Sequence, residues 1–86
     1  MSLCHVTVAP THDHKARVAV VARGGAMDLW QCSLPIAGSM LVFVSYVEMA
    51  MIDGWQLVGS PVYDTVTLTT SCWLQNPKRG ATPPSL

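Results

Sequence analysis

The sequence predicts a small α+β domain in which one helix packs on an antiparallel sheet of three to five strands. Several short runs are rich in β-branched residues and are separated by Gly, Pro or polar clusters, a pattern typical of strands. One longer apolar run of about 14 residues suits a helix better than a strand. At 86 residues the chain has the length of one domain.

Residues 1–26 are expected to form an N-terminal extension that contains a hairpin. His5–Ala9 and Ala16–Ala22 alternate or are β-branched, and Pro10 followed by a polar segment separates them. A second reading takes Met27 as the natural start, because the codons of residues 23–26 would resemble a purine-rich ribosome-binding site. The apolar character of the second strand favours a genuine hairpin.

Residues 27–75 are expected to form a β-α-β-β domain. The first strand covers Met27–Leu34 and ends at Pro35. The helix is predicted over residues 40–53, with Ser39 as its N-cap and Gly54 as the left-handed residue that ends it.

A short strand follows from Trp55, and a turn is expected over residues 63–65. The last strand is predicted over Val66–Gln75, with five residues facing inward: Val66, Leu68, Thr70, Cys72 and Leu74. Residues 76–86 hold three prolines and no periodicity, which predicts a disordered tail.

The join Asp53-Gly54-Trp55-Gln56-Leu57-Val58-Gly59-Ser60-Pro61, together with the strand and helix before it, resembles a family of short bacterial proteins catalogued as domain of unknown function 1737. The resemblance covers roughly residues 27–75. It implies one helix packed on a small antiparallel sheet, and it carries no established activity. The helix here is less charged than such helices usually are, and residues 1–26 have no counterpart in the family.

The composition indicates a covered surface. Only 12% of the residues are charged, about half the usual share of roughly 25%, and half are apolar. We therefore expect a homo-oligomer or a protein partner. Five basic and five acidic residues cancel, so nucleic-acid binding is not indicated.

The cysteine pattern and the N-terminal residues favour a cytoplasmic location. Three cysteines with no pairing pattern do not suggest a disulfide scaffold, and no signal peptide opens the chain. Ile36–Ile52 is apolar enough to raise the question of a membrane span. Its 17 residues are at the lower limit for a span, Glu48 lies within it, and no Lys or Arg flanks it, so we do not expect one.

Candidate site residues are few. Cys4, His12 and His14 are weak candidates for a metal site, because their spacing matches no established zinc pattern. No catalytic set is recognised, since all three histidines lie in the first 14 residues and Glu48 and Asp53 do not share a helix face. No cofactor is expected. Four aromatic residues are either core residues or partner-binding residues: Trp30, Trp55, Tyr63 and Trp73.

These observations predict a non-enzymatic binding or structural module that associates with itself. Two alternatives stay open. One is a small metal-binding or regulatory protein that uses the N-terminal Cys and His residues, and the other is a membrane-associated protein. The sequence names no ligand, pathway or partner.

Overall fold

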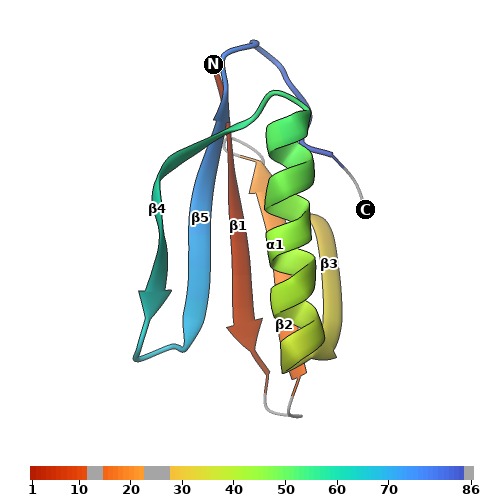
Figure 1. Cartoon of the computed structure of the whole chain (residues 1–86), viewed down its shortest axis with the longest axis vertical. Helices are drawn as coiled ribbons and strands as arrows, with labels where there is room; N and C mark the ends of the chain where they lie inside the picture. The colour runs from red at the N-terminus through yellow and green to blue at the C-terminus, as the bar shows by residue number, and fades with distance from the viewer. Residues whose placement is uncertain (12–14, 23–27, 85–86) are drawn as a thin grey trace.

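The computed structural model describes residues 1–11, 15–22 and 28–84, and for residues 28–39 it describes the backbone alone. These residues form five strands and one helix: β1 (Ser2–Pro10), β2 (Lys15–Ala22), β3 (Asp28–Pro35), α1 (Ile36–Ile52), β4 (Gln56–Asp64) and β5 (Thr69–Asn76). The strands make one sheet, on which the helix packs (Figure 1). The predicted α+β class is confirmed.

The sheet has the strand order β3-β2-β1-β5-β4, and every neighbouring pair is antiparallel. The predicted hairpin is therefore present as β1 and β2, and β1 is the central strand. The strands of the predicted domain over residues 27–75 are not all neighbours in the sheet, because β2 and β1 lie between β3 and β5. A chain that began at Met27 would lack these two strands.

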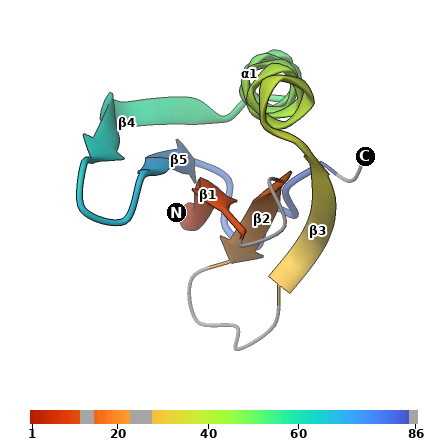
Figure 2. The ribbon, with the colours of Figure 1, turned by 90° about the horizontal axis from the view of Figure 1, so that it is seen from below.

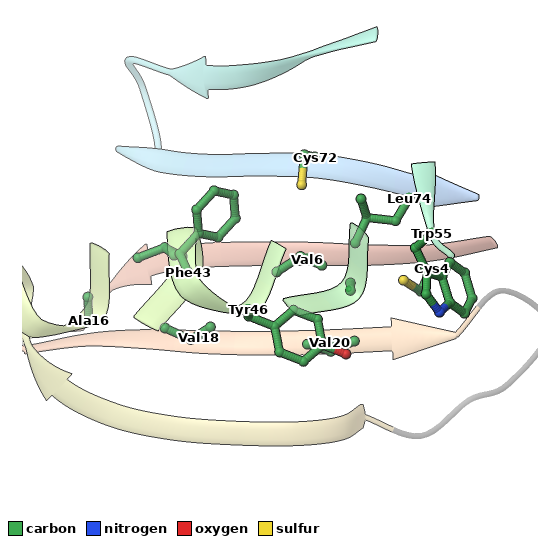
Figure 3. Packing of buried hydrophobic residues seen from close by; sticks show 12 residues of the cluster. Cys4, Val6, Ala16, Val18, Val20, Phe43, Tyr46, Trp55, Cys72 and Leu74 are labelled. Atoms are coloured by element: carbon green, nitrogen blue, oxygen red, sulfur yellow. The ribbon is translucent and has the colours of Figure 1, made fainter. Parts of the chain in front are cut away.

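One face of the sheet is packed under α1 and the other is not, as the view along the strands shows (Figure 2). The helix lies mainly over β1, β2 and β3, and it contacts β4 less. Alternate residues of β1 and β2 point toward it and are buried. The core is made of these buried side chains: Cys4, Val6, Val8, Ala16, Val18, Val20, Phe43, Tyr46, Ala50, Trp55, Cys72 and Leu74 (Figure 3).

The helix begins four residues earlier than predicted, at Ile36 in place of residue 40. It follows β3 without a separate loop, since β3 ends at Pro35. Ser39 therefore lies inside the first turn and is not the N-cap. The prediction failed because Gly38-Ser39 reads as a helix start, although a helix tolerates both residues.

The predicted helix end at Gly54 is confirmed, and its hydrogen bonds explain it. Gly54 has a positive φ of 97°. The Trp55 amide donates to the Ala50 carbonyl at 3.0 Å, and the Gly54 amide donates to the Met51 carbonyl at 3.2 Å. These two bonds define a Schellman motif. They turn the chain so that Trp55 enters the core, where it is buried.

The connection between β4 and β5 differs from the prediction. Tyr63 and Asp64 belong to β4, and the turn falls on residues 65–68. The Asp64 carboxylate accepts hydrogen bonds from the Val66 and Thr67 amides, which fixes an Asx turn. Val66 and Leu68 are consequently exposed and do not face inward. Cys72 and Leu74 are buried as predicted, and Thr70 is half-buried.

The C-terminal segment is also more ordered than the prediction. Asn76 is the last residue of β5, and residues 77–84 fold back along the molecule. Pro83 is buried, and the Tyr46 hydroxyl donates to the Pro84 carbonyl at 2.7 Å. The Ser2 hydroxyl donates to the Lys78 carbonyl at 3.1 Å. Residues 85–86 lie outside the described part of the chain.

Candidate functional site

The outward side of α1 is unusually apolar for a surface. The helix buries Phe43, Tyr46 and Ala50 against the sheet. On its opposite side it presents six exposed residues, which we call the outer face: Leu41, Val44, Ser45, Glu48, Met51 and Ile52. Four of these are large and apolar, with exposed fractions of 68% for Leu41, 47% for Val44, 51% for Met51 and 88% for Ile52. Glu48 is the single charged residue of the outer face.

A cavity of about 440 Å³ lies where the start of α1 faces the end of β4. In Figure 1 this is the lower part of the molecule, where α1 and β4 flank β1 and β5. Five elements and one turn contribute to the lining, which consists of Val8, Pro10, Ala16, Met40, Tyr63, Leu68 and Thr70. The cavity opens partly to solvent, since Met40, Tyr63 and Leu68 are exposed at its rim.

The lining chemistry of the cavity is simple. Its residues are apolar except for the hydroxyls of Tyr63 and Thr70, which are direct partners across β4 and β5. No Asp, Glu, Lys or Arg is among the described residues that line it. Met40 of the cavity rim and Leu41 of the outer face are consecutive residues of α1.

The predicted aromatic residues divide among different environments. Trp55 is buried in the core and cannot contact a partner, and its indole N–H lacks a hydrogen-bond partner among the described residues. Tyr63 is exposed and lines the cavity. Trp73 is 42% exposed on the face of the sheet that α1 leaves open. The side chain of Trp30 lies outside the described part of the structure.

Trp73 stacks on His5 across β1 and β5. Their ring centroids are 4.4 Å apart, and the planes are inclined by 19°. The backbone register places these two residues directly opposite each other. Burial lowers the pKa of His5, so the neutral imidazole is favoured in this stack. The pair is a packing contact between the neighbouring strands β1 and β5 on the open face of the sheet.

The predicted metal ligands are Cys4, His12 and His14. Cys4 is buried near the start of β1. Pro10, the last residue of β1, is six positions further along the extended strand, about 20 Å from Cys4. The two histidines themselves lie outside the described residues. Within the described residues, no group of three His, Cys, Asp or Glu could hold a metal ion.

Cys4 and Cys72 are core residues on neighbouring strands. Burial raises the pKa of each thiol from about 9 to about 11, and the nearby Cys72 adds to the rise at Cys4. A thiol with a raised pKa is a poor nucleophile at neutral pH, because the thiolate is the reactive form. Both side chains therefore act as small apolar groups, as the sequence predicts for Cys72.

Comparison with known proteins gives no relative. No family model matches the chain, and neither a curated protein nor a solved structure is similar to it. The resemblance of residues 27–75 to the bacterial family stays an expectation. Within the described residues, no helix is long and apolar enough to cross a membrane.

Proposed function

We propose that this protein is a small non-enzymatic structural or binding module that associates with itself through the outer face of α1. The observation that supports it is the outer face of α1, where four of six exposed residues are large and apolar although no described residue covers them. A helix that is apolar all round is normally buried all round. Here the sheet covers only one side, so the other side requires a partner.

A second copy of the chain is the partner that fits best. The chain has no net charge, and Glu48 is the one charged residue of the outer face. The overall charge therefore does not oppose the meeting of two copies. A standard interface takes about 800 Å² from each partner. That is about one seventh of the 5490 Å² surface of this chain. The outer face offers four large apolar side chains to such an interface: Leu41, Val44, Met51 and Ile52.

Burial supplies the driving force for this association. Each fully buried aliphatic side chain of this size contributes about 1.5–3 kcal/mol relative to full exposure. Leu41 and Val44 lie about two turns before Met51 and Ile52 on the same side of α1, so one helix-length contact can cover all four. An antiparallel pair of α1 helices around a two-fold axis would cover all four in both copies.

A set of matched Val→Lys variants tests the surface. Val44→Lys places a charge in the middle of the outer face and is expected to yield a monomer by size exclusion with light scattering. Val66→Lys, in the exposed β4–β5 turn, is expected to keep the mass of the unchanged protein. Val62→Lys probes the open face of the sheet in the same way. Dissociation by Val62→Lys but not by Val44→Lys would place the contact on the sheet and reject the proposal.

A reducing cytoplasm and the bacterial family resemblance belong to the same proposal. The free thiols of Cys4 and Cys72 support the reducing compartment.

Flotation with lipid vesicles separates self-association from membrane attachment. The protein is expected to stay with the soluble fraction, and flotation that Val44→Lys abolishes would assign the outer face to a lipid surface.

A further inference from the structure

The cavity at the start of α1 is large enough to be a ligand site in its own right. Ligand pockets in proteins commonly measure about 300–1,000 Å³, and this one measures about 440 Å³. A dry apolar cavity of about 150 Å³ is enough to bind benzene. The cavity described here is about three times larger, so it suits an occupant of about three aromatic rings or an equivalent aliphatic chain.

Among the described residues, no charged side chain lines the cavity. Lys15 and Arg17 flank Ala16 on β2, and Asp64 follows Tyr63 on β4. Successive residues of a strand point to opposite faces, so these three residues lie on the other face of the sheet from Ala16 and Tyr63. No described lining residue therefore offers an opposite charge to a bound carboxylate or ammonium, and burial of an unpaired charge is costly.

The polar atoms of the lining are hydroxyls. Tyr63 and Thr70 are paired across β4 and β5 and lie on the same face of the sheet. A hydroxyl both donates and accepts a hydrogen bond. An occupant with one neutral polar group can be anchored by such a pair, while its apolar body contacts Val8, Ala16 and Met40.

The turn that closes the cavity carries local strain. Leu68 has a positive φ of 56°, which is uncommon for a bulky residue. This backbone conformation belongs to the residue that contributes an apolar side chain to the rim. Strained residues persist where the surroundings hold them, and they cluster at ligand sites.

We propose that this cavity binds an uncharged apolar small molecule that carries one hydroxyl or carbonyl group, of the class of medium-chain alcohols. The site goes beyond self-association, since all of its lining comes from one copy of the chain. Met40, Tyr63 and Thr70 are the residues that set its size and its polarity.

Binding is tested with N-phenyl-1-naphthylamine, a neutral three-ring dye that fluoresces in apolar surroundings. We expect saturable binding to the full-length protein and displacement of the dye by 1-decanol but not by decanoate at neutral pH. Equal displacement by both competitors would overturn the proposal, because only an open apolar surface would accept the decanoate carboxylate as readily as the alcohol.

Three variants test the position and the polarity of the site. Met40→Trp fills the cavity and should weaken dye binding by roughly tenfold or more, whereas Leu41→Trp, one residue away on the outer face, should leave it unchanged. Thr70→Val keeps the volume and removes a hydroxyl, so the competing affinity of 1-decanol should fall by about fivefold. Unchanged dye binding in Met40→Trp would reject the site.

The same assay separates this site from the proposed self-association. Val44→Lys is expected to bind the dye as tightly as the unchanged protein, even as a monomer. Loss of dye binding in folded Val44→Lys would place the dye between two copies and overturn the ligand site. If the unchanged protein is a monomer, still binds the dye and loses dye binding through Met40→Trp, self-association is rejected and the ligand site stands.

Discussion

Gly54 is the residue on which the join between α1 and β4 depends. Its φ of 97° lies in the region that L side chains rarely adopt, and its amide completes the Schellman motif. A Cβ at this position would lie 3.6 Å from the Asn76 side-chain nitrogen, which is ordinary contact. Backbone strain, and not collision, therefore decides what the position accepts.

Gly54→Ala is expected to lower the free energy of unfolding by about 1–2 kcal/mol, the cost of a left-handed conformation for an L residue. Gly54→Asn should lose less, because Asn tolerates this region better. Urea unfolding of the two variants measures the difference. Equal stability of Gly54→Ala and the unchanged protein would contradict the assignment of strain.

The buried thiols predict a loss of stability in alkaline solution. The pKa of Cys4 and that of Cys72 rise from about 9 to about 11 in the fold because burial disfavours the thiolate. The unfolded chain therefore loses these protons first. Their contribution to stability is complete below about pH 9 and is lost as the pH rises toward about 11.

Urea unfolding at several pH values between about 8 and 11 measures this slope. We expect Cys72→Ala to have a shallower decline in unfolding free energy than the unchanged protein, although its stability at pH 8 is lower because of the space it leaves. Parallel slopes in the two proteins would show that other groups cause the alkaline loss.

At the scale of elements, the C-terminal segment acts as a strap beside α1. The Tyr46 hydroxyl donates to the Pro84 carbonyl, and Ser2 connects residues 78 and 81 to the start of β1. This arrangement ties both ends of the described chain to the core. Sequence composition predicted a disordered tail, because prolines without periodicity do not reveal hydrogen bonds to distant residues.

Tyr46→Phe tests the strap. Removal of the hydroxyl should lower the free energy of unfolding by about 1 kcal/mol, the typical net value of one hydrogen bond. It should also increase cleavage after Lys78 or Arg79 by trypsin under native conditions, since both residues are exposed. Val18→Ala, a change in the buried core on β2, serves as the control for general destabilisation. Equal cleavage of Tyr46→Phe and the unchanged protein would contradict the role of the bond.

Local signals explain which elements the sequence could predict. Alternation identified β1 and β2, and a glycine at the right place identified the end of α1. The start of α1 and the β4–β5 turn were misplaced because competing signals were stronger. Ser39 resembles an N-cap, and the apolar residues Val66 and Leu68 continue a strand pattern that the hydrogen bonds of Asp64 interrupt.

At the scale of the whole molecule, strand order and the cavity were beyond sequence reasoning. Several orders are compatible with five antiparallel strands, and only the fold places β1 at the centre. The residues that line the cavity are spread along the sequence between residue 8 and residue 70, so no local motif predicts it. Low charge predicted an apolar surface that a second copy or another partner covers. The outer face of α1 is an exposed apolar surface, and what covers it stays a prediction.

The central claim is that this outer face is a contact between copies of the chain. Sedimentation equilibrium of the full-length protein, from roughly one to several hundred micromolar, tests it most directly. We expect the mass to rise from 9.3 kDa toward twice that value as concentration increases, and Val44→Lys to stay at the lower mass. A constant mass of 9.3 kDa for the unchanged protein over the whole range would contradict the account.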